Sequence, residues 1–407
     1  MRAYERLIRY AKFDTPSCGE NETCPSTPEQ LVLADALAQE LRELGVSDVR
    51  ADEHGYVYGR IPANIPDCTA PGIGFIAHMA VATDVPCTGV QPQVLHYAGG
   101  DLLLSKETGA VLSEAEFPVL ANYRGCDLVT TDGSTLLGAD NKAGIAEIMT
   151  AAERLLAPDA PPHGDVCIGF TPDEEIGRGA DLFDVAGFGA PFAYTVDGGA
   201  FGQVEYETFN AAAAVITIKG KNIHPGDAKN KMKNALLLGM EFNSMLPPAE
   251  IPAHTEGHEG FYHLTKFSGA EETAVLRYIL RDHDWDKLTA RKETVLRIAA
   301  YMNDKYGADT VTVKLQDSYR NMAEVIREHW HLIEVAYEAV TACGGEPVSP
   351  PVRGGTDGSR LSYMGLPCPN LGTGSHNHHG RLEYAVVQEM DKCVDAIVKI
   401  AELYGKR

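Results

Sequence analysis

The sequence predicts an α/β protein that carries an inserted domain of a different kind. Short apolar runs without polar alternation occur at 72–77, 166–170 and 193–196, a pattern typical of strands buried on both faces. An amphipathic helical pattern at 141–156 lies between the first two runs. This alternation of strands and helices indicates an open sheet covered by helices.

The first long helix is predicted to end at Gly45, a residue type common just past helix C-termini. Thr27, Pro28 and Gln30 have the form of a capping box with proline in the first turn. Helical spacing then gives one apolar face, made by Leu31, Leu33, Ala34, Leu37, Leu41 and Leu44. We interpret this face as structural, because it would pack on the sheet.

From about Ala211 the elements follow the order β-α-β-β-α-β, which is typical of a ferredoxin-like domain. The predicted strands are 213–219, 261–267, 274–281 and 310–315, and the predicted helices are 228–245 and 285–306. The α/β pattern resumes after Asp317 and ends in a helix at 386–403. We therefore expect a discontinuous catalytic domain, residues 1–208 and 317–407, with an inserted ferredoxin-like α+β lid domain, residues 209–316.

Composition and charge exclude several classes of protein. Of the 407 residues 44% are hydrophobic and 23% charged, the balance of an ordinary folded chain. The formal net charge is −22, from 35 Lys and Arg against 57 Asp and Glu, and no dense basic cluster offsets it. Phosphate backbones would be repelled, so we expect no nucleic-acid partner. No apolar run approaches the ~18 residues of a membrane span, so we expect no membrane partner.

The nine cysteines contain no Cys-x-x-Cys pair, which argues against both a disulfide framework and a thiolate zinc site. The N-terminal residues are charged where a secretory signal needs an apolar core. Together these features predict a cytoplasmic protein. A serine hydrolase is disfavoured because no GxSxG motif occurs, and 197–202 matches neither a dinucleotide-binding fingerprint nor a P-loop.

Ionisable side chains directly follow each apolar run, at the edge where open α/β sheets bind ligands. His78 follows the first run, Asp173, Glu174 and Glu175 the second, and Asp197 the third; Asp140 precedes a helix, and His378 and His379 follow a glycine-rich stretch. Any one of them alone would be read as a cap, a turn or a core residue. A cluster of several carboxylates, however, requires positive charge at its centre.

Divalent metal ions would supply that charge. Two imidazoles and three carboxylates suit zinc, or manganese or cobalt, at two sites that share a bridging carboxylate. Two ions ~3.5–4 Å apart would activate a hydroxide between them. One of the adjacent Glu174 and Glu175 would then bind metal while the other acts as general base, and the spacing does not decide which.

These motifs resemble those of the peptidase T group of tripeptide aminopeptidases, in the dizinc aminopeptidase and carboxypeptidase clan (the M20 metallopeptidase family). The similarity spans nearly the whole chain in order. It rests on His78, Gly138–Gly144, Thr171–Glu175, Tyr194–Gly199, Asn222–Gly226, Gly257–Leu264, Arg353–Gly358 and His379-Gly380. The resemblance implies a zinc-peptidase-like catalytic domain with a mixed central sheet flanked by helices, and an aminopeptidase that removes the N-terminal residue of tripeptides.

The resemblance also implies roles for individual residues. One zinc ion would bind His78 and Asp197 and the other Glu175 and His379, with Asp140 bridging them. Glu174 would be the general base. In the inserted domain His224 would contact the tetrahedral intermediate, while Arg281 and Arg353 would hold the substrate's C-terminal carboxylate, for which the guanidinium fork is suited.

One departure from the family pattern concerns Ala80, which stands where the family has an aspartate that orients the metal-binding His78. Loss of such a partner typically costs ~10–100-fold in metal affinity or activity, so we expect impaired hydrolysis. Asp84 is a candidate substitute. Two alternative functions follow: a catalytically silent relative that binds metal or peptide, and another hydrolase of the clan, such as a dipeptidase or deacylase.

Overall fold

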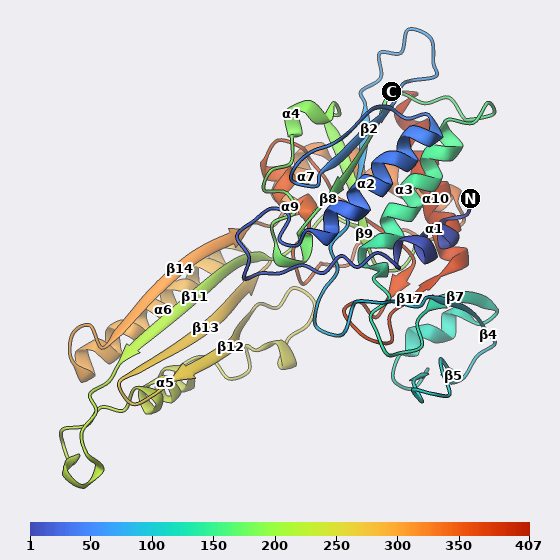
Figure 1. Ribbon diagram of the computed structural model, residues 1–407. Helices are drawn as coiled ribbons and strands as arrows, with labels where there is room; N and C mark the ends of the chain where they lie inside the picture. Colours follow the sequence, from blue (N-terminus) through green and yellow to red (C-terminus); the bar gives the residue numbers. More distant parts are fainter. The chain divides into compact units, whose positions relative to one another are not determined.

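The computed structural model describes all 407 residues, Met1–Arg407. The chain forms two compact units (Figure 1). Unit 1 consists of Met1–Tyr206, Glu324–Pro350 and Thr356–Arg407, and unit 2 of Glu207–Ala323 and Pro351–Gly355. Unit 1 is therefore discontinuous in sequence.

The core of unit 1 is a seven-stranded mixed sheet, which confirms the predicted α/β class. Its strand order is β1-β2-β8-β3-β9-β15-β10, and the central strands β8, β3, β9 and β15 run parallel to one another. The strands are β1 (Ser47–Ala51), β2 (Val57–Ile61), β3 (Ile73–His78), β8 (Val166–Thr171), β9 (Phe192–Gly198), β10 (Val204–Glu205) and β15 (Asn370–Gly372). Every residue of β3 and β8 is buried, as their apolar runs predicted.

Helices cover this sheet, and α3 packs directly against β3 and β9. The helices of unit 1 include α1 (Ala3–Tyr10), α2 (Glu29–Leu44), α3 (Ala139–Leu155), α4 (Val185–Phe188), α8 (His331–Ala342), α9 (Asp357–Tyr363) and α10 (Val387–Tyr404), and α7 (Ala323–Ile326) begins at its boundary. The predicted capping box of α2 is wrong. Thr27 Oγ1 donates to the carbonyl of Pro16, and the side-chain Nε2 of Gln30 donates to the Asp173 carboxylate at 2.8 Å. Neither side chain therefore caps the helix.

A smaller antiparallel sheet in unit 1 has the order β16-β17-β7-β4. Its strands are β4 (Gln93–Tyr97), β7 (Cys126–Thr130), β16 (Ser375–His376) and β17 (Tyr384–Val386), and β5 (Leu102–Leu103) pairs with β6 (Val111–Leu112) beside it. Tyr97, Leu128 and Tyr384 belong to its own apolar core. The sheet matters for the site because the loop between β16 and β17 carries His379.

Unit 2 is a four-stranded antiparallel sheet of order β12-β13-β11-β14. Its elements are β11 (Asn210–Lys219), α5 (Ala235–Ser244), β12 (Phe261–Gly269), β13 (Thr273–Asp282), α6 (Trp285–Tyr306) and β14 (Val311–Tyr319), the predicted β-α-β-β-α-β order. Alternate residues of β11, such as Ile216 and Ile218, belong to the same core as α5 and α6. Helix α5 begins later than predicted because Asn234 caps it, accepting from the amides of Leu236 and Leu237.

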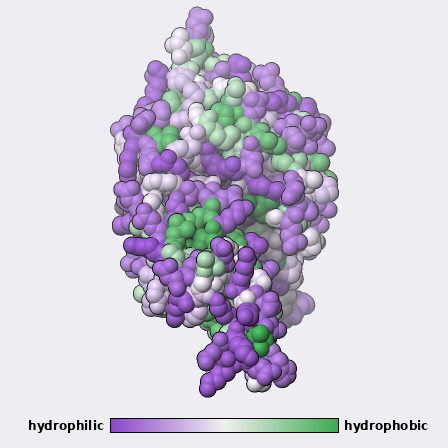
Figure 2. All heavy atoms as spheres, turned by 90° about the vertical axis from the view of Figure 1, so that its left-hand side faces the viewer, coloured by the Kyte–Doolittle hydropathy of each residue, from purple (hydrophilic) through white to green (hydrophobic).

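None of the helices combines the length and the apolar character that a bilayer span requires. On the face shown in Figure 2 hydrophilic residues predominate, and apolar residues form separate patches. The nine cysteines are all free thiols.

Helix α3 contains a buried carboxyl group without a partner. Glu147 is fully buried, and neither of its carboxylate oxygens has a hydrogen-bond partner. Burial, helped by the nearby Glu389 and Asp391, raises the pKa of Glu147 well above its usual range. The folded protein therefore retains a proton that the unfolded chain releases.

We expect Glu147→Gln to stabilise the protein increasingly as the pH rises. Below the ordinary glutamate pKa of ~4.3 both states hold the proton, so the variant gains little there. Above it the unfolded wild-type chain binds fewer protons than the folded one, so wild-type stability falls with pH while the amide is unaffected. Thermal unfolding should show a midpoint ~2 °C or more higher for the variant at pH 8 than for wild type. Exposed Glu22→Gln is the control, and an equal gain at pH 4 would contradict the argument.

Candidate metal centre

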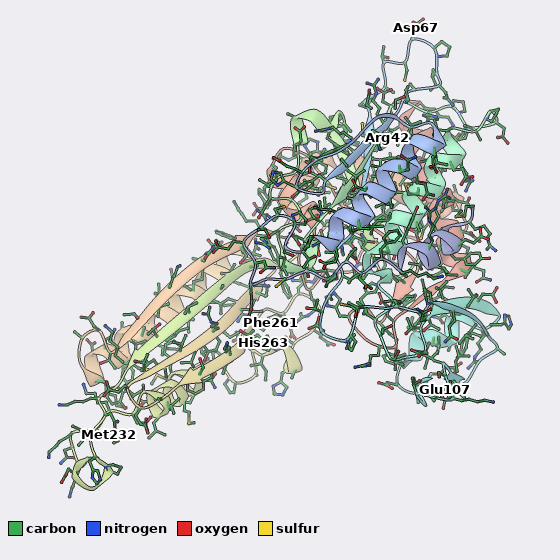
Figure 3. The ribbon with its side chains drawn as sticks, viewed as in Figure 1. Arg42, Asp67, Glu107, Met232, Phe261 and His263 are labelled. Atoms are coloured by element: carbon green, nitrogen blue, oxygen red, sulfur yellow. The ribbon has the colours of Figure 1, made fainter.

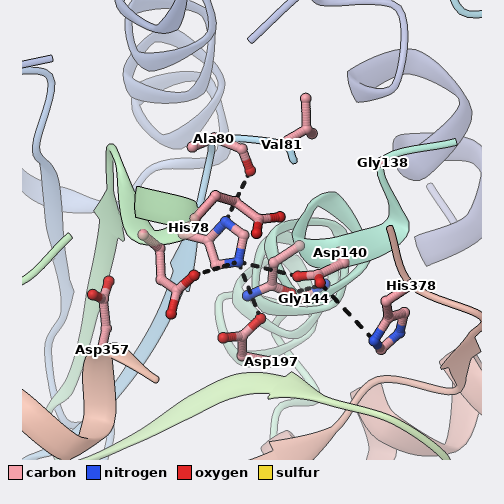
Figure 4. A network of polar contacts seen from close by, with 12 residues as sticks. His78, Ala80, Val81, Gly138, Asp140, Gly144, Asp197, Asp357 and His378 are labelled. Carbon is pink, nitrogen blue, oxygen red and sulfur yellow. Dashed lines mark hydrogen bonds and ion pairs between the residues drawn. The ribbon is translucent and has the colours of Figure 1, made fainter. Parts of the chain in front are cut away.

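The carboxyl ends of three parallel strands bring ionisable side chains to one edge of the main sheet. His78 ends β3, Glu174 and Glu175 form the turn after β8, and Asp197 lies near the end of β9. Asp140 joins them from the first turn of α3. His379 comes from the loop between β16 and β17. All six residues lie in unit 1, and Figure 4 shows His78, Asp140 and Asp197 facing one another.

Asp140 lies between the two histidines and presents one carboxylate oxygen to each. His78 Nε2 is 3.1 Å from Asp140 Oδ1, and His379 Nε2 is 3.2 Å from Asp140 Oδ2. On the first side His78 Nε2 is also 3.3 Å from Asp197 and 3.7 Å from Glu174. On the second side His379 Nε2 is 3.0 Å from Glu175. The geometry thus has two halves that share one carboxylate.

The charges and unsatisfied atoms of this cluster fit divalent cations. Ligand atoms of His78, Asp140 and Glu175 lie within 4.8 Å of one another. Glu175 Oε1 is buried and has no hydrogen-bond partner, which a metal bond would satisfy. Nitrogen and oxygen donors of this kind suit zinc, manganese or cobalt.

Burial and the neighbouring charges shift the pKa values of the carboxylates in different directions. Burial, reinforced by Asp140 and Asp357, raises the pKa of Asp197 to about 7 although His78 opposes the rise. Burial likewise raises the pKa of Glu174 well above its usual range. Asp140 behaves in the opposite way, because its contacts with His379 and His78 outweigh burial and hold its pKa well below normal. A shortage of positive charge therefore remains in the cluster.

The two histidines respond to the same field. Burial disfavours the charge on His78, but Asp197, Asp140 and Glu174 outweigh burial and hold its pKa well above the usual value. Contacts with Asp140 and Glu175 raise the pKa of His379 to about 11. His378 does not share this position, because its Nε2 pairs with Ser375 Oγ at 2.8 Å and its Nδ1 lies 3.9 Å from Asp140.

The orientation of His78 is set by the backbone of Ala80. His78 Nδ1 lies 2.9 Å from the Ala80 carbonyl, a contact visible in Figure 4. A carbonyl oxygen can only accept, so Nδ1 carries the proton and Nε2 faces the carboxylates. The expectation that His78 lacks an acceptor is therefore wrong. Asp84, the candidate substitute, lies instead 3.4 Å from Nδ1 of His379.

Asp173 anchors the turn that carries Glu174 and Glu175, a role that sequence reasoning missed. Its buried carboxylate accepts three hydrogen bonds. They come from the backbone N–H of Ser26 at 2.6 Å, the Ser26 hydroxyl at 2.5 Å and the side-chain Nε2 of Gln30 at 2.8 Å. Its own amide donates to Gln30 Oε1 at 3.0 Å. The left-handed φ of 53° at Asp173 aims the next two residues at the cluster.

Asp357 was also missed as a site residue, although it lies inside the 353–358 motif. It is buried, and Thr171 Oγ1 donates to its carboxylate at 2.7 Å. Burial raises its pKa to about 6, while the Thr171 hydrogen bond and His78 oppose the rise. The available signal was a carboxylate within the glycine-rich part of that motif. Asp357 adds a further acidic group to the surroundings of Glu174 and Asp197.

The two arginines predicted to bind substrate lie in unit 2 and differ in their partners. Arg281, on β13, has no carboxylate among the groups that shift its pKa; its Nη1 donates to the carbonyl of Leu280 at 3.0 Å, and the guanidinium lies over the Tyr319 ring. Burial lowers its pKa. Arg353 is hydrogen-bonded to the 255–259 loop. Its guanidinium donates at 2.8 Å to the carbonyls of Gly257 and Glu259 and to the hydroxyl of Thr255.

His224 is not brought near these arginines within unit 2. Arg281 pairs with Ala211 at the start of β11, whereas His224 lies in the exposed loop beyond Lys219 at its end. Figure 3 shows the two ends of this unit, marked by Phe261 beside Arg353 and by Met232 in the loop. Eight strand residues separate the ends by roughly 25 Å. A tripeptide extends only ~10 Å, less than half of this backbone separation.

The comparisons with known proteins identify the family to which the chain belongs. The model of "Peptidase family M20/M25/M40" matches residues 131–403. The chain is 54% identical to Peptidase T of Halothermothrix orenii over 407 residues, which cover 100% of both proteins.

Solved structures share the fold at low sequence identity. A tripeptidase from Staphylococcus aureus subsp. aureus Mu50 has a TM-score of 0.79 at 20% identity, covering 100% of this chain and 98% of that one. A dinuclear metal-binding M20 peptidase from Bacillus subtilis has a TM-score of 0.64 at 15% identity, covering 99% and 98%. Since the family model matches residues 131–403 and the Halothermothrix relative aligns over the full length, the chain belongs to peptidase family M20/M25/M40.

Proposed function

We propose that this family member is a two-metal aminopeptidase that removes the N-terminal residue from tripeptides. The observation that carries the proposal is Asp140, whose two oxygens face His78 Nε2 at 3.1 Å and His379 Nε2 at 3.2 Å. A carboxylate so placed suits a bridge between two ions. The relative named Peptidase T, at 54% identity over its full length, supports the choice of substrate.

In this proposal His78 and Asp197 would hold one ion, Glu175 and His379 would hold the other, and Asp140 would be shared by both. When bound, divalent ions would supply Lewis-acid activation of water and of the scissile carbonyl. Zinc is the proposed metal, with manganese or cobalt as alternatives, because all three accept these donors. The cytoplasm remains our proposed compartment.

Glu174 moves the proton in the proposed reaction. Its Oε2 lies 3.7 Å from His78 Nε2, and the group is nearly buried, so its carboxylate faces the cluster and not bulk water. Burial raises its pKa well above the usual range, which suits a group that accepts a proton from attacking water and returns it to the leaving amine. Asp173 keeps the turn of Glu174 rigid through Ser26 and Gln30.

Arg281 is the stronger candidate for binding the peptide carboxylate, because its guanidinium has no acidic partner. Arg353 contributes chiefly by holding the 255–259 loop. His224 enters the proposal only as a residue supplied by a second copy of the chain. A protein that is monomeric by sedimentation at assay concentration would remove His224 from the mechanism.

Two alternatives remain distinct from this proposal. A silent metal- or peptide-binding relative would bind metal without hydrolysing any peptide. A dipeptidase or deacylase of the same family would hydrolyse other substrates faster than tripeptides. Hydrolysis of a panel of tripeptides, dipeptides and acylated amino acids, with metal content measured on the same sample, separates all three.

The two adjacent glutamates should give opposite results when each is changed to glutamine. Glu174→Gln should keep the wild-type metal content and lose at least ~100-fold in kcat, because it removes a base and not a ligand. Glu175→Gln should lose metal and activity together. Elemental analysis after dialysis against dilute zinc, combined with tripeptide hydrolysis, checks both. Loss of metal in the first variant and retention in the second would reverse the assignment.

Arg281→Ala should lower kcat/KM for tripeptides by ~10–100-fold, the usual effect of losing a charge-assisted hydrogen bond. Amidating the substrate's C-terminus should cost wild type a similar factor and cost the variant little more. Exposed Arg277→Ala, four residues earlier on β13, is the matched control and should leave kinetics unchanged. Equal cleavage of free and amidated tripeptides by wild type would show that no arginine recognises that end.

Ala80→Asp should raise tripeptide hydrolysis by less than about threefold. The missing aspartate was expected to cost ~10–100-fold, but Nδ1 of His78 already donates to the Ala80 carbonyl. Ala80 is fully buried, so a new carboxyl group there would instead reduce stability. Buried Ala82→Asp controls for that loss. A tenfold or larger gain in kcat/KM would mean that the carbonyl alone does not hold the imidazole.

A further inference from the structure

A buried glutamate holds the backbone that presents Asp140. Glu383 is fully buried, just before β17. Its Oε2 accepts from the amides of Leu137 at 3.1 Å and Gly138 at 2.7 Å, and its Oε1 accepts from the amide of Asp140 at 2.9 Å. One carboxylate thus takes three backbone N–H groups from a single four-residue segment.

The conformation of that segment explains why its amides converge. Gly138 has a left-handed φ of 75° immediately before α3, and successive N–H groups around such a residue form a concave anion-binding site. Leu137 precedes the helix, Gly138 is its N-cap and Asp140 lies in its first turn, so none of these N–H groups has a partner within the helix. The contacts use both oxygens, so the side chain is fixed in place.

Glu383 also belongs to the loop that supplies His379. Its amide donates to the Gly380 carbonyl at 3.2 Å, closing the turn directly after His379. Its own carbonyl accepts from the Thr130 hydroxyl at 3.3 Å, which ties the loop to β7. The residue therefore connects two segments far apart in sequence. One carries Asp140 and the other carries His379, and these two side chains meet at 3.2 Å.

We propose that Glu383 is a positioning residue that fixes Asp140 relative to His379 and thereby sets the affinity of the protein for its metal ions. The inference deepens the proposed function and depends on it, because it assumes that Asp140 and His379 bind metal. Glu383 acts through backbone amides and does not reach the reacting atoms. Removing its carboxylate would leave the 137–140 amides unpaired in a buried site and release Asp140 from its position.

The test compares Glu383→Gln with Glu147→Gln in the full-length protein. Both changes are isosteric and remove a fully buried carboxyl group next to or within α3, but Glu147 has no hydrogen-bond partner. Glutamine at 383 would place an NH2 donor against a backbone N–H. Metal-free protein is titrated with zinc by calorimetry and with cobalt by visible absorption, and thermal unfolding without metal monitors the fold.

We expect Glu383→Gln to bind zinc ~10–100-fold more weakly than wild type, with a changed cobalt spectrum, and Glu147→Gln to bind as wild type does. Equal affinity of Glu383→Gln and wild type would overturn the inference, as would equal weakening in both variants. Should Glu383→Gln fail to fold, Glu383→Asp is judged by the same criteria, since its shorter side chain keeps the charge but not the reach. Wild-type protein that binds no metal would instead refute the proposed function.

Discussion

Mutual repulsion among the carboxylates at one edge of the main sheet is the constraint on which the site depends. Asp140, Glu174, Glu175 and Asp197 converge where only two imidazoles offer positive charge. Burial raises the pKa values of Asp197 and Glu174, and the neighbouring carboxylates reinforce that rise; the same carboxylates hold the pKa of both histidines above the usual value. Cations between these groups would relieve the repulsion, because opposite charge stabilises each ionised form.

Hydrogen bonds to backbone groups hold several side chains of this cluster in place. The Ala80 carbonyl sets the tautomer of His78, and the amides of 137–140 are held by Glu383. Backbone contacts do not depend on which side chain the residue carries. For this reason Ala80 can still orient His78 through its carbonyl. A comparison of motifs detects only that an aspartate is missing at position 80.

The two arginines of unit 2 show how partners change the role of a residue type. Arg353 donates three hydrogen bonds to the 255–259 loop, which leaves fewer of its N–H groups for a ligand. Arg281 is surrounded by carbonyls and the Tyr319 ring, and burial lowers its pKa, so an incoming carboxylate would supply charge compensation that the protein does not. A sequence motif treats both residues as equivalent cations.

The sequence by itself determined the features that depend on local pattern. Continuous apolar runs identified β3, β8 and β9, and the ionisable residues after them had to meet because parallel strands end at one edge. The pattern of the sequence likewise predicted the β-α-β-β-α-β order of the elements of unit 2. Excess carboxylate charge then implied metal ions.

Only the tertiary structure decided matters that depend on contacts between distant segments. The Gln30 side chain donates to Asp173 instead of capping its own helix. Asp84 lies beside His379 and not beside His78. Glu383, in the loop that carries His379, accepts from the Asp140 amide. Each contact links residues more than 100 positions apart. Local periodicity carries no information about such pairs, because side-chain direction and backbone hydrogen bonds arise from the packing of the whole unit. The hydrogen-bond acceptor of His78, the Ala80 carbonyl, could not be predicted from the sequence for a related reason: every residue has a backbone carbonyl.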